Sequence, residues 1–355
     1  MINPFEEQGY LLPLASLNNL PIAPTGMTAK DVCSTNAVLH QIADYLHLPK
    51  DISATDWPLH FAKSLKMPAT SAQATAVVEH IAQNLSQLLW TLKQGINHPS
   101  IQARYPNWHS EHWAYWASID CIHLAGGLLN GTLGTALLPI LQTKLRASAL
   151  PPIHLSLVRY PAIISLLGAA KYASCLCECA LIFDFGHSYI KQGYFSQCDG
   201  NLKLHTFCPV PALYTQYEYD TSQAERQAAK KLSDFIIQTI VNLFQTVTAQ
   251  GLPVCNTIII SIANYVNNGL FASRAGYGKL NLVYMPYSDF LSDALFESTG
   301  QRFNIEFLHD GTAGAYAAQN HPLQHEAFIA MGTSLSVGFP SSQMDFDFPC
   351  EIINE

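Results

Sequence analysis

The chain has 355 residues, of which 49% are apolar and only 12% are charged. This composition excludes disordered, collagen-like and coiled-coil chains, and it indicates a large buried core. The 26 acidic and 18 basic side chains give a net charge of -8. We therefore expect no nucleic-acid partner, because binding a phosphate backbone requires an excess of positive charge.

The length and the distribution of apolar residues and cysteines indicate a cytoplasmic protein of two domains, without a membrane partner. No apolar run reaches the length of a membrane span, and the first residues lack the pattern of a secretory signal. The nine cysteines are odd in number and mostly isolated, which is typical of reduced thiols. Cys175, Cys177 and Cys179 alternate within one segment. That spacing is narrower than the C-x2-C of zinc sites, so it favours thiols over a metal site.

The first half of the chain predicts a helical region followed by a small α/β unit. The first fifty residues indicate loops and short helices. Apolar residues at helical spacing from Ser71 predict one amphipathic helix that ends at Gly95. Apolar runs and glycine turns then predict a β-turn-α-β-α unit. Its members are a strand over 119–124, a turn at Gly126 and Gly127, a helix over about 132–145, a strand over 153–157 and a helix over about 166–173.

An aromatic loop just before this unit holds Trp108, Trp113 and Trp116. Tryptophans grouped in this way indicate either core packing or an interface patch. His109 and His112 lie beside them at H-x-x-H spacing. Since no third ligand is in view, we favour a structural role for these histidines over a metal site.

The second half predicts a hairpin, a long helix and several buried strands. In chain order these are a strand over 180–185 and its partner IKQGYF, a turn at Asp199-Gly200, a helix from the capping box Ser222-x-x-Glu225 to Gly251, strands over 257–262 and 304–308, the small-residue helix TAGAYAAQN, and the strands EAFIAM and LSVGF. The branched apolar residues of 257–262 are typical of a strand covered on both faces.

Two of the predicted strands end in a carboxylate that is closely followed by a glycine. These carboxylates are Asp184 in DFGHS and Asp310 in HDG. Phosphoryl transfer needs glycine-turn amides around the phosphates, a carboxylate that holds Mg²⁺, and a second carboxylate that accepts the hydroxyl proton. DFGHS with Lys191 and the segment MGTSLS supply candidate phosphate contacts, and LAGG supplies a candidate adenine contact. The chain contains no Walker A loop.

With these residues the sequence resembles the sugar kinases of the actin, hexokinase and heat-shock chaperone superfamily, nearest to the ROK family and the hexokinases. The resemblance rests on DFGHSYIKQGYF, IIISIANYV, FLHDGTAGAYAA and AFIAMGTSLSVGF. Asp184, Asp310 and Gly332-Thr333 fall on the first phosphate motif, the catalytic Asp and the second phosphate loop of that family. The resemblance implies an α/β protein with the two-lobed actin-like ATPase (ribonuclease H-like) fold, which binds ATP and Mg²⁺ in a cleft between its lobes.

A further segment resembles the end of a ROK protein although it comes early in this chain. Residues 122–173 carry counterparts of the I-x-L-G-G-G adenosine motif and of the terminal L-G-A-A helix. Circular permutation explains this order, and it is tolerated because domain termini lie at the surface. The permuted order predicts an adenosine-binding lobe over 1–178 and a phosphate-binding, catalytic lobe over 179–355.

The resemblance implies ATP-dependent phosphorylation of a sugar or related small hydroxyl compound, with Asp310 as general base and Asp184 holding Mg²⁺ directly or through water. The residues assigned to phosphate or nucleotide binding are Asp184, Gly186, His187, Ser188, Lys191, Gly332, Thr333, Ser334, Gly126 and Gly127, and those assigned to substrate binding are Asn264, Asn281 and His309. The expected partner is a small sugar-like molecule, and a homodimer is a conceivable assembly.

Departures from the family motifs leave two alternatives open. His187 and Ser188 replace Gly-Thr, His309 replaces an Asn, and Ser334 and Ser336 lie where the family is richer in glycine. The E-x-G-H and C-x-C-G-x-x-G-C motifs of ROK proteins are missing, so the sequence does not identify the sugar. The first alternative is a catalytically inactive nucleotide-binding scaffold of the same fold. The second is a protein whose filled phosphate pocket binds no nucleotide.

Overall fold

The computed structural model describes residues 2–22, 26–49, 51–148, 150–198, 201–216, 218–318, 325–340 and 350–354. It is a mixed α/β protein, and parallel pairs join strands in both of its larger sheets. The chain divides into two compact units. The first comprises Met1–Glu6, Leu14–Ala162 and Leu323–Val337, and the second comprises Glu7–Pro13, Ile163–Pro322 and Gly338–Glu355.

These units differ from the predicted lobes 1–178 and 179–355 in three segments, of which Glu7–Pro13, assigned to the second unit, is the shortest. The helix α8 (Ile164–Ser174), predicted in the first lobe, belongs to the second unit. The strand β12 (Glu326–Met331), predicted in the second lobe, belongs to the first unit. The physical reason is long-range pairing: β12 runs parallel to β3 (Cys121–Ala125), and α8 packs on α11 (Asp310–Ala318).

The first unit builds a four-stranded sheet under a layer of helices. The strands lie in the order β13-β12-β3-β4, and β3 pairs in parallel with both of its neighbours. The remaining strands are β4 (His154–Leu157) and β13 (Leu335–Gly338). The helices are α1 (Ala29–Cys33), α2 (Thr35–Tyr45), α3 (Trp57–Lys66), α4 (Ser71–Gln94), α5 (Pro99–Arg104), α6 (Ser110–Ser118) and α7 (Thr132–Ala147).

The predicted helix from Ser71 to Gly95 is confirmed as α4, with Gly95 at its carboxyl cap. The cap does not need a left-handed backbone, because φ at Gly95 is -53°. A side chain there would overlap the indole ring of Trp113 on α6. Gly95 is therefore required by the close packing of two helices.

The second unit is built on a six-stranded sheet in the order β11-β8-β5-β6-β7-β14. The predicted hairpin is confirmed, since β5 and β6 pair antiparallel, and β6 continues antiparallel into β7. The strands β8 and β11 run parallel to β5 on its other side. The strands are β5 (Cys179–Phe185), β6 (Tyr189–Cys198), β7 (Asn201–Pro211), β8 (Thr257–Ile262), β11 (Asn304–His309) and β14 (Cys350–Asn354). The turn predicted at Asp199-Gly200 lies outside the described residues.

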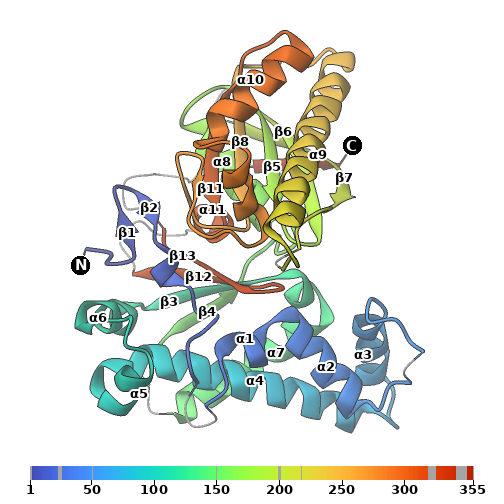
Figure 1. Ribbon diagram of the computed structural model, residues 1–355. Helices are drawn as coiled ribbons and strands as arrows, with labels where there is room; N and C mark the ends of the chain where they lie inside the picture. Colours follow the sequence, from blue (N-terminus) through green and yellow to red (C-terminus); the bar gives the residue numbers. More distant parts are fainter. Residues whose placement is uncertain are drawn as a thin grey trace. The chain divides into compact units, whose positions relative to one another are not determined.

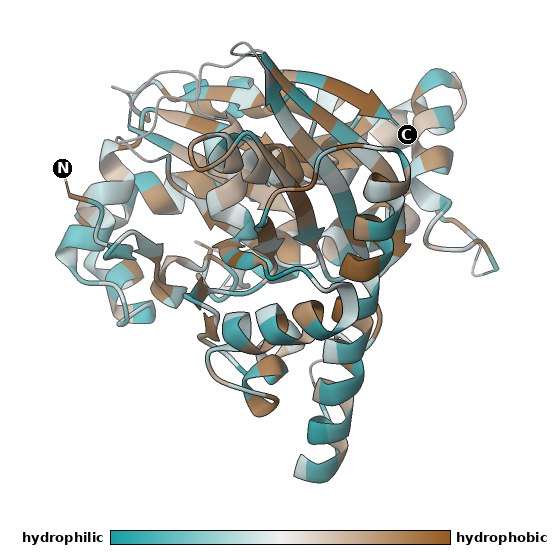
Figure 2. Cartoon of the chain, turned by 90° about the horizontal axis from the view of Figure 1, so that it is seen from above, coloured by the Kyte–Doolittle hydropathy of each residue, from teal (hydrophilic) through white to brown (hydrophobic). Residues whose placement is uncertain are grey.

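Two layers of helices cover this sheet. The helices α9 (Ser222–Ala249) and α10 (Tyr287–Thr299) share one apolar core with alternate residues of β5, such as Leu181 and Phe183. The helices α8 and α11 pack against each other and on the strands (Figure 1). In Figure 2 both strands and helices carry apolar and polar segments, and brown is prominent on strands near the centre of the view. Because successive residues of a strand face opposite sides, Asp184 faces away from the core that Phe183 enters.

One predicted helix start is wrong by one residue. The side chain of Thr221, not Ser222, caps α9 by accepting a hydrogen bond from the backbone of Ala224. Glu225 forms an ion pair with Arg274 at 2.5 Å, which replaces the predicted capping box.

Smaller elements connect these layers. They are β1 (Glu6–Glu7), β2 (Tyr10–Leu11), β9 (Val266–Asn267), β10 (Leu270–Phe271) and the 3-10 helices η1 (Pro13–Ala15), η2 (Gly95–Asn97), η3 (Gly127–Leu129) and η4 (Gly276–Leu282). None of the described helices is both long enough and apolar enough to cross a membrane.

Candidate functional site

The carboxyl ends of three neighbouring strands meet at one edge of the second unit's sheet. Asp184 near the end of β5 is in register with Ser261 of β8, and β11 runs into Asp310 at the first position of α11. In open α/β sheets, ligands bind beyond the carboxyl ends of the strands. The structure therefore brings both predicted carboxylates to the edge where a ligand is expected.

Asp184 is a buried carboxylate with two partners from the flanking strands. Its Oδ2 lies 2.6 Å from Nζ of Lys191 on β6, and its Oδ1 accepts a 3.3 Å hydrogen bond from Ser261 Oγ. The side chain of Asp184 is 4% exposed and that of Lys191 is 31% exposed. The ion pair is thus buried on the carboxylate side and reaches solvent on the lysine side.

Lys191 experiences the charge of both predicted carboxylates. Burial by itself lowers the pKa of Lys191, but the facing carboxylates of Asp184 and Asp310 outweigh burial and raise the pKa above its ordinary value. The ammonium group is therefore fully charged at neutral pH. Two carboxylates and one cation form a single electrostatic group at this edge of the sheet.

Asp310 is oriented by its own helix and by the preceding histidine. Its Oδ1 accepts a 2.8 Å hydrogen bond from the backbone N–H of Gly311 and lies 3.2 Å from His309 Nε2. Burial lowers the pKa of His309, opposed by the charge of Asp310, so the ring is neutral at neutral pH. A neutral ring with its proton on Nε2 donates to Asp310. Stacking on Tyr265, with ring centroids 4.3 Å apart, fixes the plane of this imidazole.

The start of α11 is held by a close contact with α8. A side chain at Gly168 would overlap the carbonyl oxygen of Ala313, so the two helices approach at a distance that only glycine permits. Ser165 Oγ also donates a 3.2 Å hydrogen bond to the Asp310 carbonyl. This packing fixes the backbone from which the Asp310 carboxylate projects.

In the DFGHS turn a backbone amide that could bind phosphate is already hydrogen-bonded within the turn. The N–H of Gly186 donates to the Tyr189 carbonyl at 3.1 Å, and the Tyr277 hydroxyl donates to the Gly186 carbonyl at 2.8 Å. The ring of His187 stacks on the same tyrosine, with centroids 6.2 Å apart. Gly186 therefore contributes turn geometry, while its own amide is already bonded within the turn.

The two asparagines predicted to contact substrate differ in their surroundings. The amide of Asn281 bonds both backbone groups of Phe271, at 3.2 and 2.8 Å, which pins β10. The amide nitrogen of Asn264 bonds Ser273 and Ala275, but its buried Oδ1 has no hydrogen-bond partner among the described residues. Asn264, just beyond the end of β8, therefore keeps one unused acceptor, whereas both the oxygen and the nitrogen of the Asn281 amide bond Phe271.

The remaining predicted nucleotide residues lie together in the first unit. Gly126 follows β3 with φ at +127°, and a side chain there would overlap the Met331 carbonyl oxygen at the end of β12. The turn Gly332–Ser334 closes with a hydrogen bond from Gly332 N–H to the Ser334 carbonyl. The sequence missed that these two glycine turns are direct neighbours, since β3 and β12 pair in parallel.

The residues that the sequence did not single out are the ones that orient the predicted ones. Ser261 bonds Asp184, Tyr265 stacks on His309, and Tyr277 bonds and stacks on the DFGHS turn. Only Ser261 carried a usable signal, because a hydroxyl inside TIIISI interrupts an apolar strand beside another strand that ends in Asp.

Two other sequence features have structural roles. Trp108, Trp113 and Trp116 are buried, which confirms core packing rather than an interface patch. The ring of His112 accepts a hydrogen bond from the His109 backbone at the start of α6.

The cysteines whose side chains the structure describes are free, as expected. Among the described residues, the side-chain group with metal-binding geometry does not include Cys175, Cys177 or Cys179.

A polar depression of about 240 Å³ lies elsewhere in the second unit. Its lining residues are Asn268, Ser288, Asp289, Ser292, Phe303, Asn304, Ile305, Glu306 and Phe307. The depression includes none of Asp184, Lys191 and Asp310, so it is separate from the candidate site.

Comparison with known proteins adds no family assignment: no protein-family model and no curated protein matches the chain. Function is therefore inferred from the site itself.

Proposed function

We propose that the chain is an ATP-dependent kinase that phosphorylates a sugar or a related small hydroxyl compound. The observation that carries this proposal is the group formed by Asp184, Lys191 and Asp310 at the carboxyl edge of β5, β8 and β11. Phosphoryl transfer needs a cation for the phosphate oxygens, a carboxylate for Mg²⁺ and an acceptor for the hydroxyl proton. This edge of the sheet offers all three groups on rigid elements.

The order of the strands supports the actin-like ATPase fold as part of this proposal. In the second unit, the antiparallel strands β7-β6-β5 are followed by β8 and β11, both parallel to β5. This arrangement is the one expected of a ribonuclease H-like lobe. The first unit repeats its central part in the order β13-β12-β3-β4.

The origin of the first unit's strands supports circular permutation. The strands β12 and β13 come from the end of the chain, whereas β3 and β4 come from its first half. In an unpermuted relative, the equivalents of β12 and β13 would precede those of β3 and β4. The structure joins the two pairs into one sheet although about 200 residues separate them in the chain.

Asp184 suits a magnesium site because its bonding is incomplete. An ionised carboxylate has about four acceptor positions, and Lys191 and Ser261 use two of them. The residual capacity favours contact with Mg²⁺ through a bound water. When bound with ATP, Mg²⁺ neutralises charge on the phosphate oxygens.

Asp310 and His309 have different roles toward the hydroxyl acceptor. Asp310 accepts the proton of the attacking hydroxyl, and His309 acts as a positioning residue that holds one carboxylate oxygen in place. Lys191 contributes a positive charge to the transferred phosphoryl group. The chemical nature of the acceptor is expected from the sequence resemblance, with Asn264 as its candidate polar contact.

A nucleotide-binding scaffold is the second candidate, and one feature favours it. The amide of Gly186 bonds within its own turn, which leaves fewer backbone donors for phosphate than a glycine-rich loop provides. A scaffold would bind nucleotide at this edge without transferring phosphate.

The test is ADP release from Mg-ATP across hexoses, N-acetylhexosamines and other polyols, with the Asp310→Asn variant beside the wild type. A kinase gives acceptor-dependent release that the variant loses. The control is Asp293→Asn, which removes an exposed carboxylate in an ion pair with Arg302. ATP binding without release from any acceptor would replace the kinase by the scaffold.

A further inference from the structure

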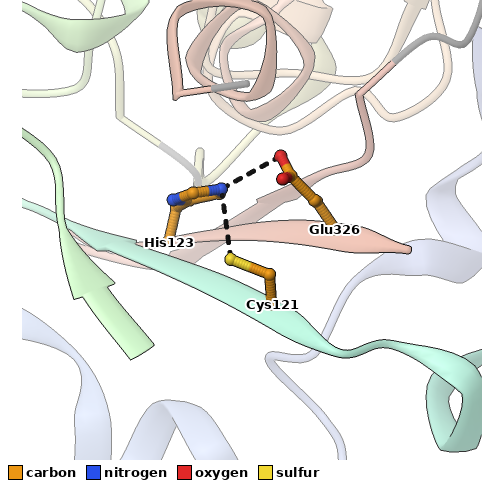
Figure 3. Close-up of side chains that lie close together, drawn as sticks. All are labelled: Cys121, His123 and Glu326. Atoms are coloured by element: carbon orange, nitrogen blue, oxygen red, sulfur yellow. Dashed lines mark hydrogen bonds and ion pairs between the residues drawn. The ribbon is translucent and has the colours of Figure 1, made fainter. Parts of the chain in front are cut away.

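Three side chains with metal-ligating atoms meet in the first unit at the amino ends of β3 and β12, away from the glycine turns that follow these strands (Figure 3). Cys121 is the first residue of β3 and is in register with Glu326, the first residue of β12. His123 follows Cys121 by two positions, so both side chains lie on one face of the strand. The parallel pairing of two distant segments therefore assembles the group.

The separations of the ligand atoms fit a tetrahedral ion. His123 Nε2 lies 3.6 Å from Cys121 Sγ and 3.1 Å from Glu326 Oε2, and the three ligand atoms all lie within 4.8 Å of one another. Zinc bonds of about 2.3 Å to sulfur and about 2.0 Å to nitrogen and oxygen place tetrahedral ligand atoms about 3.5 Å (S to N) and about 3.3 Å (N to O) apart. The observed S-to-N and N-to-O separations are thus within about 0.2 Å of those that a zinc ion requires.

Burial makes the group incomplete without a cation. The side chain of Glu326 is 0% exposed, and its Oε1 has no hydrogen-bond partner among the described residues. A buried carboxylate is strongly destabilising unless its charge is compensated. A thiolate at Cys121 and a carboxylate at Glu326 together balance the two positive charges of a divalent ion.

The neighbouring strand orients the imidazole toward such an ion. Ser156 Oγ on β4 lies 2.7 Å from Nδ1 of His123, which is in register with it. A proton on Nδ1 shared with Ser156 leaves the lone pair of Nε2 directed at the cluster. Metal-binding histidines are commonly fixed in this way through their second nitrogen.

We propose that Cys121, His123 and Glu326 bind one Zn²⁺ ion, with water as the fourth ligand, and that this ion fastens β12 to β3. Thiolate and imidazole ligands select zinc over Mg²⁺ or Ca²⁺, which prefer oxygen. Binding replaces the S–H bond of Cys121 by a sulfur–zinc bond and releases the proton to solvent. The site is separate from the proposed kinase site, and its existence does not depend on kinase activity.

The expected role is structural, because the ligands span a long stretch of chain. Residues 123 and 326 are 203 positions apart. A cross-link that closes so long a loop restricts the unfolded chain more than a short one does. It also joins two segments of the first unit that are far apart in sequence, Leu14–Ala162 and Leu323–Val337.

The test measures metal in the full chain, purified without an affinity tag that binds metal and without chelator. Elemental analysis is expected to give one zinc per chain. After chelation, titration with Co²⁺ is expected to produce a thiolate-to-cobalt charge-transfer band that saturates at one equivalent. The matched variants are Cys121→Ala, which loses the band, and Cys33→Ala, which removes another buried thiol of the same unit and keeps it.

A second variant keeps the test decisive where Cys121→Ala does not fold. Glu326→Gln preserves size and leaves the thiol in place, and it is expected to weaken Co²⁺ binding by at least about tenfold. The proposal is overturned if the wild type contains no zinc and binds no Co²⁺ after chelation. It is equally overturned if Glu326→Gln and the wild type bind Co²⁺ with the same affinity.

Discussion

At the carboxyl edge of the second unit's sheet, the buried Asp184 has a lysine and a serine as partners, whereas at the amino edge of the first unit's sheet the buried Glu326 has one histidine. The second unit supplies its own cation, Lys191. In the first unit the described partner of Glu326 is His123, and the second oxygen of that carboxylate has no hydrogen-bond partner among the described residues. The buried charge is balanced by an internal lysine in the second unit, and we propose that a bound ion balances it in the first unit.

The two edges also lead into different surroundings. The edge with Asp184 continues into the DFGHS turn and the first turn of α11, and ligands of open α/β sheets bind beyond this end of the strands. The edge with Glu326 is enclosed, since Cys121, His123 and Glu326 are all buried. We infer that the edge with Asp184 performs chemistry and that the edge with Glu326 provides stability.

The largest expected effect is a loss of turnover, without a loss of stability, at the edge with Asp184 and Asp310. Asp310→Asn is expected to lower turnover by about 10²–10⁴-fold, the usual contribution of a general base. The amide still accepts the hydrogen bond from Gly311, so the melting temperature should stay near that of the wild type. Steady-state ADP release and thermal unfolding check the two statements. Turnover within a few-fold of wild type would remove Asp310 from the mechanism.

The next effect is on the free energy of unfolding, and it tests whether an ion binds at the edge with Glu326. With zinc present at about 1,000 times its dissociation constant, the first unit should gain about 4 kcal/mol. After chelation, Glu326→Gln should be more stable than the wild type, because it removes a buried carboxylate of which one oxygen has no hydrogen-bond partner among the described residues. With zinc, the order should reverse. Thermal unfolding of both proteins with and without zinc measures this crossover, and an unchanged order would argue against the ion.

A glycine pair tests the neighbouring turns of the first unit. Gly126→Ala should cost about 2–3 kcal/mol, because φ is +127° and the new methyl group overlaps the Met331 carbonyl. Gly127→Ala is the matched control, since no atom lies within 4 Å of its added carbon. Denaturant unfolding compares the two variants. Equal stabilities would mean that β3 and β12 do not approach as closely as described.

The smallest effect concerns Lys191, which forms the ion pair with Asp184. Lys191→Met leaves Asp184 without its cation and should cost about 1–2 kcal/mol, reduced from a fully buried pair because Lys191 reaches solvent. Asp310→Asn provides a comparison that keeps the ion pair with Asp184.

The pH dependence of this contribution follows from the raised pKa of Lys191. A pKa that is higher in the folded state stabilises the fold fully below the unfolded value of 10.5, and the contribution is lost as pH rises through the folded value. The stability difference between wild type and Lys191→Met should therefore be constant near neutral pH and shrink above about pH 10.5. A difference that grows at alkaline pH would contradict the pairing.

Local patterns made much of the fold predictable. The strand β8 has the predicted bounds 257–262, and α4 has the predicted start and end, because apolar periodicity and caps act over a few residues. The division into units was not predictable in the same way. It depends on the pairing of β12 with β3 and of α8 with α11, and local sequence carries no signal of such distant contacts.

The candidate sites show the same limit. Asp184 and Asp310 stood out because each lies where an apolar strand runs into a glycine turn. The sequence indicates Cys121 as an isolated thiol, because Glu326, the third member of its group, lies about 200 residues away and joins Cys121 and His123 only through the sheet. The interaction of Lys191 with Asp184 likewise depends on the register of the β5–β6 hairpin.

The most direct test of the central claim is calorimetric titration of the wild type, Asp184→Asn and Asp310→Asn with ATP, each with and without Mg²⁺. The account predicts Mg²⁺-dependent binding to the wild type, nearly unchanged binding to Asp310→Asn, and loss of the Mg²⁺ dependence in Asp184→Asn. A wild type that binds no ATP with Mg²⁺ would contradict a nucleotide site at the carboxyl edge of β5, β8 and β11.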